Sequence, residues 1–497
     1  MPVVPLKLAS KTQVSGHFFV RRRLAFALLR HSVNMEVNPV RWQRTLLMLS
    51  AVFGVVLVVG AFLFGWFRPA GLVGTSRIVA DRRLGTLYVS VDGRLHPALN
   101  LVSAQLIAGS PDAPTFVSPE DIAKWPKGPT VGIIGAPVET PVVQSPDVAR
   151  WAVCDSASST VGGAPTVTGI DGQLALGQEA GELAEDQGVL LSYRQHSYLV
   201  TGGLRMAVDL ADSAVTAALG LHSSVAAGMS RALFDALPAG GSLVVPAVPE
   251  AGAPARVDLG PGVVIGAVVA SQDVATSADR FYVVLGDGVQ PISPVVAAML
   301  RQRNSYGLAA APHVSPDRLA RIPVRHVLDV DYYPKSPVRM VDTSVQPVTC
   351  VSWRWGVSER QARVAVVSGR GLPITSAQHA RLVGLVGGGR DGVQADQVLL
   401  AEGASTFVTT TGSALDSPAR ETMWLISATG SRYGVAFDEN SVKALGLTAA
   451  QVRPAPWSML RVWARGPELS RAAALTVHDS LDGAAPIVVS RTARAGG

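Results

Sequence analysis

The sequence contains two cysteines, Cys154 in "WAVCD" and Cys350 in "PVTCVSW", and these are its first candidates for chemistry. Two cysteines allow one intramolecular pair. Such a disulfide would close a very long loop and would stabilise the fold by at most about 5 kcal/mol in a chain-entropy estimate. The alternative is two separate buried thiols. Because no other cysteine or histidine stands at ligand spacing from either residue, the pattern disfavours a metal site.

Catalytic motifs are missing from the sequence. It has no G-x-x-x-x-G-K-[ST] phosphate loop, no H-E-x-x-H and no G-x-S-x-G, so the patterns that announce nucleotide, zinc or serine-hydrolase chemistry are absent. The glycine-rich run "GLVGGGRDG" (384–392) lies in a polar stretch between predicted strands and is not followed by a helical pattern, which favours a flexible turn. We therefore predict no catalytic residue and no metal ligand, and the sequence leaves any cofactor-binding residue unknown.

One apolar segment dominates the hydropathy of the 497-residue chain. The stretch "LLMLSAVFGVVLVVGAFLFGWF" (46–67) carries no charge and stands between Arg44 and Arg68. A helix needs about 20 apolar residues to cross a bilayer. A cleavable signal peptide fits poorly, because the apolar run is too long, starts late and is followed by "WFRPAG". We expect one transmembrane helix over residues 45–68.

Charge predicts the orientation of that helix. Residues 1–44 have a net charge of +7, whereas the whole chain has +6. Positive flanks stay in the cytoplasm, so the region after the span is expected outside the inner membrane, where disulfides persist. Because the basic residues gather in the N-terminal tail, the sequence has no basic groove of the kind that binds nucleic acid.

Within the tail, "GHFFVRRRLAFALLRHSV" (16–33) predicts an amphipathic helix with the arginines Arg21, Arg22 and Arg23. A basic helix of this kind lies on an anionic leaflet or docks to a cytoplasmic partner. The sequence does not separate these two interpretations.

A short phrase recurs four times after the span. Each copy opens on an aromatic residue, turns on a glycine and closes on a small-residue helical pattern; the aromatic residues are Tyr88, Tyr198, Tyr282 and Trp424, and the glycines are Gly93, Gly203, Gly288 and Gly430. We interpret each copy as a ββα-type module followed by a short helix. Each cysteine lies between two copies, which predicts a duplicated half built as module, β segment and module, with a quasi-two-fold axis near the cysteines.

The predicted fold class is therefore α+β: one N-terminal transmembrane helix, then a large region with a central β platform and four repeat modules. The expected segments are a basic cytoplasmic tail (1–44), the span (45–68), module 1 (72–130), central β segment 1 (131–190), module 2 (191–250), module 3 (263–330), central β segment 2 (331–415), module 4 (416–480) and a C-terminal tail (481–497).

Several stretches resemble one known family over essentially the whole chain. They are "TQVSGHFFVRRRLAFALLRHSVNMEVNPVR", "IVADRRLGTLYVSVDGRLHPALNLVSAQLIAGSPDAPTFV", "SRALFDALP", "LGDGVQPISPVVAAML" and "RGPELSRAAAL". They are similar to the EccB family, the single-pass core component of the mycobacterial type VII (ESX) secretion machinery. The resemblance implies an inner-membrane protein with a periplasmic region, a Cys154–Cys350 disulfide and self-association through that region.

The same resemblance implies EccC, EccD and EccE as partner subunits and a role in exporting small helical effector proteins. The family also has an ATPase ascription, which would make ATP a ligand although this sequence offers no Walker motif for it. Two alternatives to the secretion-scaffold interpretation are therefore an ATP-hydrolysing enzyme of the same complex and an anchored cell-wall-binding module.

Overall fold

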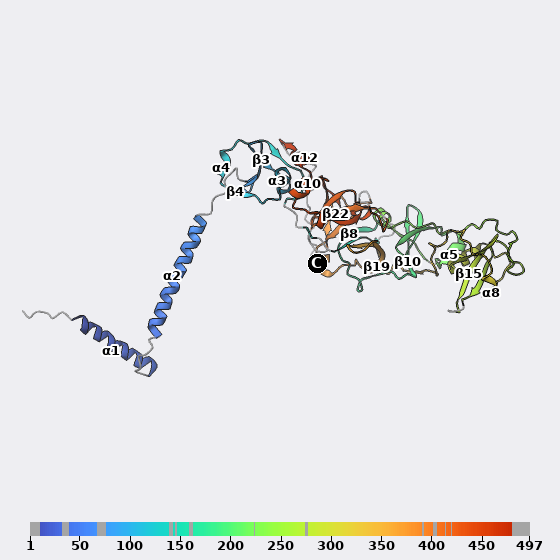
Figure 1. The fold of residues 1–497 in the computed structure, drawn as a ribbon, viewed down its shortest axis with the longest axis horizontal. Coiled ribbons are helices and arrows are strands. Elements are labelled where there is room, and N and C mark those ends of the chain that lie inside the picture. Colours follow the sequence, from blue (N-terminus) through green and yellow to red (C-terminus); the bar gives the residue numbers. More distant parts are fainter. Residues whose placement is uncertain are drawn as a thin grey trace, which may run out of the picture. The chain divides into compact units, whose positions relative to one another are not determined.

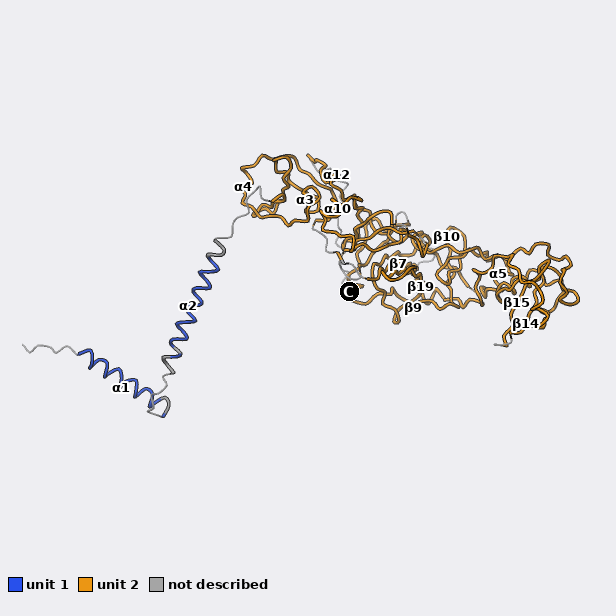
Figure 2. Tube along the Cα trace, in the orientation of Figure 1, with its two compact units in different colours: residues 1–72 blue, residues 73–497 orange. Residues whose placement is uncertain are grey.

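The fold is described from a computed structural model, which consists of two compact units, residues 1–72 and residues 73–497 (Figure 2). It describes residues 10–31, 39–66, 76–138, 143–144, 147–158, 163–222, 224–273, 277–389, 392–400, 405–412, 414–418 and 420–479. The expected C-terminal tail (481–497) lies outside these residues.

The described residues of the first unit form helices α1 (Lys11–Arg30) and α2 (Pro39–Trp66) (Figure 1). Ser10 caps α1, because its side chain accepts a hydrogen bond from the backbone N–H of Gln13, which satisfies a donor that the first turn leaves open. Among the described residues, α2 is the one helix long and apolar enough to cross a membrane, over Arg44–Phe62. The expected apolar helix is present and begins six residues earlier than predicted, at Pro39.

The centre of the second unit is a mixed β-sheet, here called the platform. Within the described residues its strand order is β20-β21-β8-β7-β18-β19-β9. Its strands are β7 (Val148–Ser156), β8 (Thr166–Asp171), β9 (Ala180–Glu182), β18 (Val348–Gly356), β19 (Arg363–Gly369), β20 (Val383–Gly384) and β21 (Gln397–Leu400). The antiparallel pair β7·β18 lies at the middle and joins the two predicted β segments.

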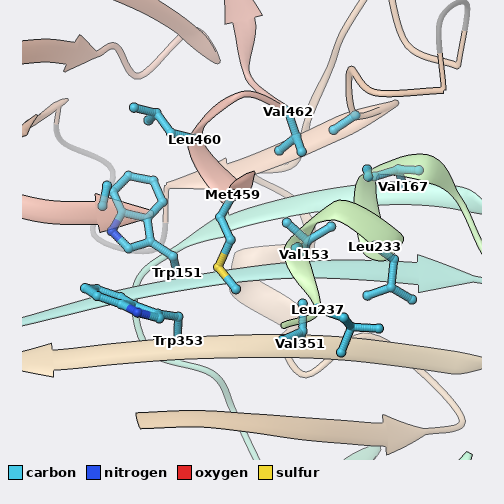
Figure 3. Packing of buried hydrophobic residues seen from close by; sticks show 14 of the residues in the cluster. Trp151, Val153, Val167, Leu233, Leu237, Val351, Trp353, Met459, Leu460 and Val462 are labelled. Atoms are coloured by element: carbon cyan, nitrogen blue, oxygen red, sulfur yellow. The ribbon is translucent and has the colours of Figure 1, made fainter. Parts of the chain in front are cut away.

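The two faces of the platform bury different side chains. One face carries Trp151 and Val153 of β7 with Val351 and Trp353 of β18, packed against α6 (Arg231–Ala236) and α11 (Trp457–Leu460) (Figure 3). The neighbouring positions point to the opposite face, where Cys154 and Cys350 are buried, since successive side chains of a strand alternate between faces. Apolar burial on both faces explains the nearly continuous hydrophobic runs of these strands.

The platform is interwoven between the two halves of the chain. Strand β9, which follows β8, pairs with β19 of the later half, whereas β21 of the later half pairs with β8 of the earlier half. Each half of the chain therefore supplies a strand that pairs with a strand of the other half. The paired segments are about 200 residues apart in the sequence, so no local pattern encodes this pairing.

Four segments outside the platform share one order of elements: three antiparallel strands, a helix, a segment parallel to the first strand, a short helix and a segment parallel to the third strand. This order appears four times in the described residues. The ββα description from the sequence is wrong in one respect, because a further strand precedes the aromatic strand of every module. That strand lacks a recurring marker, and its pairing is visible only in the folded chain.

The elements of the four modules are as follows. Module 1 comprises β1 (Ile78–Asp81), β2 (Leu87–Val91), β3 (Arg94–Ala98), α3 (Leu101–Ala108), β4 (Thr115–Val117), α4 (Pro119–Ala123) and β5 (Thr130–Val131). Module 2 comprises β10 (Gln187–Tyr193), β11 (His196–Thr201), β12 (Leu204–Val208), α5 (Ser213–Leu219), β13 (Ala227–Gly228) and α6. Module 3 comprises β14 (Val268–Gln272), β15 (Asp279–Leu285), β16 (Gly288–Ile292), α7 (Pro294–Arg303) and α8 (Pro316–Leu319). Module 4 comprises β22 (Ser405–Thr411), β23 (Met423–Ile426), β24 (Ser431–Val435), α10 (Glu439–Ala444), η1 (Ala449–Gln451), β25 (Arg453–Pro456), α11 and β26 (Ala464–Arg465). The remaining elements are β6 (Val143–Gln144), β17 (Arg339–Met340), α9 (Ser376–His379), α12 (Arg471–Ala474) and β27 (Val477–His478).

The modules pack in pairs that cross the two halves of the chain. Modules 1 and 4 share a core in which α3 contacts α10 and α12, and β27 pairs with β5. Modules 2 and 3 share another core in which α5 contacts α7. A module of about 50 residues is too small to bury an adequate core alone, so each pair buries together what a single module would leave exposed.

Two expected segment boundaries differ from those of the structure. The boundary at 190/191 cuts β10, and the boundary at 415/416 assigns β22 to the platform although β22 pairs with β23 of module 4. Strand-forming composition continues across 190/191, so the sequence shows no break there. At 415/416 the sequence does break, but the strand before the break belongs to module 4 and not to the platform.

Candidate functional site

The two cysteines form a disulfide across the centre of the platform. Cys154 on β7 lies directly opposite Cys350 on β18, in a register that also places Trp151 opposite Trp353. Both cysteine side chains are fully buried. The bond therefore joins the central strands of the two halves at the point where they are already paired.

Asp155, which follows Cys154 on β7, ties the platform to module 2. Its carboxylate accepts hydrogen bonds from the backbone N–H of Ser230 (2.6 Å) and from the Ser230 hydroxyl (2.7 Å). Ser230 is the residue that caps α6. Burial raises the pKa of Asp155 to about 7, repulsion from Asp396 adds to the rise, and the two bonds from Ser230 oppose it. Burial disfavours the charged form of a carboxyl group, so this residue titrates near neutral pH.

One position on the third strand of each module separates the modules into two kinds. It lies opposite the second residue after the aromatic marker and is occupied by Leu95, Arg205, Val289 and Arg432 in modules 1 to 4. The same position pairs in parallel with the segment after the second helix of each module. The two modules that contribute helices to the platform thus carry an arginine where the other two carry an apolar residue.

Both arginines lie beneath aromatic rings. The Arg205 guanidinium carbon is 3.8 Å from the ring centre of Phe234, and its Nε donates to the Phe234 carbonyl. Arg432 donates to the Trp463 carbonyl, and its guanidinium carbon is 5.0 Å from the ring centres of Trp424 and Trp457. Burial lowers the pKa of Arg432 to about 10, with further lowering by Arg465 and Arg461. The cations attract the ring faces and hold the rings in place.

The signal for these arginines was readable but was missed. Modules 2 and 4 have "TGGLR" (201–205) and "TGSR" (429–432) at the meander turn, whereas modules 1 and 3 have "DGRL" (92–95) and "DGVQ" (287–290). Aligning the four turns would have separated the two kinds of module.

The recurring turn glycines do not all serve the same purpose. Gly93, Gly203 and Gly430 have positive φ values of 74°, 80° and 85°, which glycine adopts at no steric cost. Gly288 has no such backbone. A Cβ there would lie 2.3 Å from the carbonyl oxygen of Pro323, so glycine is needed for the close approach of the chain after α8.

Helix α1 presents Arg21, Arg22 and Arg23 as three consecutive exposed residues. Successive residues of an α-helix are rotated by about 100°, so the three cations spread around the helix. The expectation of an amphipathic helix is wrong on this point, because exposed apolar residues such as Phe18, Phe19 and Leu24 also occupy several sides. The docking role of the three arginines stays a prediction.

The glycine-rich run 384–392 leads from β20 towards β21, and no helix begins between these strands in the described residues. In the same part of the chain, no group of three or more His, Cys, Asp or Glu side chains is arranged to hold a metal ion. Arg390 and Asp391 lie outside the described residues.

Fold and site together define a class of protein: one candidate membrane helix followed by a large α+β region that contains a mixed sheet with a buried disulfide. Residues 6–483 match the family described as "Type VII secretion system ESX-1, transport TM domain B". The chain belongs to this family, the EccB proteins of type VII secretion systems.

Its relatives are similar over nearly the whole length. The "ESX-2 secretion system ATPase EccB2" of Mycobacterium tuberculosis is 44% identical over 499 residues, covering 99% of this chain and 100% of the relative. A chain in the structure of an intact ESX-5 inner membrane complex has a TM-score of 0.75 at 38% identity, covering 98% of this chain and 99% of that chain. The EccB3 dimer from the ESX-3 core complex has a TM-score of 0.72 at 41% identity, covering 81% and 100%.

Proposed function

We propose that this protein is a single-pass inner-membrane core subunit of a type VII (ESX) secretion complex. The observation that carries the proposal is the similarity over 98% of the chain to a component of an intact ESX-5 inner membrane complex. The protein supplies a scaffold and assembly surface on the periplasmic side, and the complex exports small helical effector proteins. The interwoven platform, joined by Cys154–Cys350, supports this role because it packs with modules 2 and 4, which share cores with modules 3 and 1.

The proposed topology places the N-terminus in the cytoplasm and residues 73–497 in the periplasm. The charge of the first 44 residues supports this orientation. A reporter that is active only in the periplasm should work when fused after Gly497, and one that is active only in the cytoplasm should work when fused at Met1. The opposite pattern would contradict the topology and leave the family assignment intact.

The proposed partners are EccC, EccD and EccE, together with further copies of this chain. The EccB3 dimer of a relative supports self-association. The test is to solubilise the membrane complex in detergent, purify it through a tag on this chain, and identify the co-purifying subunits by mass spectrometry. A tagged single-span protein unrelated to secretion serves as the control. Purification of this chain alone would favour an anchored cell-wall-binding module over a complex subunit.

Nucleotide hydrolysis is a second candidate, because relatives at 44% identity carry the name ATPase. The sequence argument against it is the missing lysine-bearing phosphate loop. We expect any ATP hydrolysis to separate from the purified full-length chain over successive columns. Hydrolysis that stays with the chain and is abolished by a point substitution would establish an enzyme and would make the scaffold role incomplete.

A further inference from the structure

A hollow of about 220 Å³ lies at one end of the central strands of the platform. Its lining includes the small side chains of Ser352 and Ala365, which lie opposite each other on β18 and β19, and two leucines, Leu174 and Leu176, of the segment after β8. Sites for whole small molecules typically measure about 300–1,000 Å³. A hollow of this size therefore admits one functional group of a ligand.

Three arginines stand in a row across the strands that form the hollow. Arg354 on β18 lies directly opposite Arg150 on β7 and directly opposite Arg363 on β19, and all three line the hollow. Arg150 is an even number of residues from Cys154, so the row lies on the face of the sheet that carries the disulfide. Like charges directly opposite each other on neighbouring strands destabilise a sheet. The row therefore costs stability unless negative charge compensates it.

The chain supplies only part of that negative charge. Glu182 on β9 is 3.1 Å from Arg363, and Glu359 pairs with Arg354. Both ion pairs are exposed, so solvent screens them. Arg150 is half-buried, and its side chain forms no hydrogen bond or ion pair within the described part of the chain. Its charge is the one left uncompensated.

The space beside Arg150 is open because the neighbouring position is a glycine. Gly172 follows β8 and lines the hollow, and its N–H donates to the Arg150 carbonyl at 3.0 Å. Since glycine has no side chain, nothing at this position covers the guanidinium group.

The charges of the hollow select an anion. Its lining holds three arginines and one carboxylate, Glu182. Counting Glu359 as well still leaves one positive charge in excess. Asp171 at the end of β8 does not offset it, because Asp171 lies opposite Trp151 on the other face of the sheet and accepts a hydrogen bond from Thr406 there. An anion therefore gains Coulomb energy on entry, whereas a cation loses it.

The free donors favour a phosphate group over a carboxylate. Arg354 and Arg363 each use Nη2 for their carboxylate partner. Their other N–H groups and all those of Arg150 form no hydrogen bond among the described residues, and a guanidinium group has five N–H donors. A carboxylate has two oxygens, which match one guanidinium fork. A terminal phosphate has three strong acceptor oxygens and a charge of about −1.5 to −2, so it uses donors from more than one arginine.

We propose that this hollow binds a terminal phosphate group, with Arg150 as its principal contact and Arg354 and Arg363 as further donors. The inference goes beyond the proposed function and does not depend on it. It assigns binding and no hydrolysis. Inorganic phosphate and a phosphomonoester share the required chemistry, and the test separates these two sources.

The test uses the purified full-length chain in a non-ionic detergent and a chloride buffer near neutral pH. The probes are inorganic phosphate, glycerol 3-phosphate, the diester glycerophosphoglycerol and acetate. Binding is measured by isothermal titration calorimetry and by broadening of the phosphorus NMR signal. We expect at least one terminal phosphate to bind, and the diester and acetate to bind about tenfold more weakly. Binding of inorganic phosphate alone identifies the free ion as the ligand, whereas binding of glycerol 3-phosphate identifies an ester.

Arg150→Gln should weaken phosphate binding by about tenfold, because it removes a cation and its fork of donors. The matched control is Arg82→Gln, which makes the same change at an exposed residue of module 1 and should leave the affinity unchanged. Arg150→Lys keeps the charge but loses the planar fork, so its affinity should lie between those of Arg150→Gln and the parent chain. If Arg150→Gln does not fold, Arg150→Lys decides.

Thermal unfolding separates a ligand contact from a structural role of Arg150. Without phosphate, Arg150→Gln should unfold at or above the Tm of the parent chain, because it removes one of three opposed cations. Phosphate at 100 times the parent Kd should raise the parent Tm by about 3 °C and that of Arg150→Gln by about half as much.

The proposal is overturned if neither terminal phosphate binds, if Arg150→Gln binds as tightly as the parent chain, or if acetate or the diester binds as tightly as the better terminal phosphate. A lower Tm of Arg150→Gln in the absence of phosphate would also contradict it, because Arg150 would then stabilise the fold.

Discussion

Replacing Asp155 by asparagine should change how the stability of the platform depends on pH. The Asp155 carboxyl group is buried between β7 and the start of α6, with both hydrogen bonds coming from Ser230. Asparagine has the same shape and can accept the Ser230 N–H bond, but it does not titrate. The substitution therefore isolates the effect of the carboxyl proton.

The sign follows from the two pKa values of Asp155. The folded chain holds the proton up to pH about 7, whereas the unfolded chain releases it near the ordinary value of 3.8. Between these values the folded state binds more protons, so the free energy of unfolding falls as pH rises, by about 1.4 kcal/mol per pH unit. This loss ends near pH 7. Between pH 5 and pH 7 it amounts to about 3 kcal/mol.

The measurement is the difference in Tm between the variant and the parent chain, from pH 5 to pH 8, in detergent solution. Taking the difference removes the contributions of the other titrating groups. For a unit of this size, about 3 kcal/mol corresponds to about 3 °C. We expect the Tm of Asp155→Asn to rise by this amount relative to the parent as pH increases, and the difference to be constant above pH 7.

Asp209→Asn is the control, because Asp209 is an exposed turn residue; it should follow the parent at every pH. A Tm difference for Asp155→Asn that stays constant within about 1 °C across the range would refute the reasoning. It would mean that Asp155 is already ionised in the folded chain at pH 5.

Three further predictions concern the disulfide, a turn and the N-terminal helix. Cys154→Ser should lower the Tm, with a loss of at most about 5 kcal/mol in the free energy of unfolding, and should leave one free thiol. Two free thiols found by labelling the denatured, non-reduced parent chain would contradict the disulfide. Gly288→Ala should destabilise module 3 by about 2 kcal/mol or more, because its Cβ would meet the Pro323 carbonyl. Gly181→Ala, where a Cβ meets nothing within 4 Å, should differ little from the parent in thermal unfolding. Reversing the charges of the arginine triplet 21–23 to glutamate should reduce recovery of the assembled complex or attachment of α1 to anionic vesicles; normal assembly and vesicle binding together would exclude both docking roles.

Local patterns of the sequence were sufficient for several features. The uncharged run from 46 to 67 predicts α2, because helix length and apolar character are properties of contiguous residues. The aromatic markers and turn glycines similarly mark the second and third strands of each module, because turn chemistry acts over a few residues. The charge of the N-terminal tail and the family resemblance are likewise readable without a fold.

The tertiary structure decided which distant segments meet. The pairing of β9 with β19 and of β21 with β8, and the sharing of cores between modules 1 and 4, join residues far apart in the chain. Non-local pairing depends on the burial available to the complete chain, so the first strand of each module had no local signature. The buried Asp155 carboxyl group has the same origin, because its burial and its raised pKa arise only after β7 and α6 pack together.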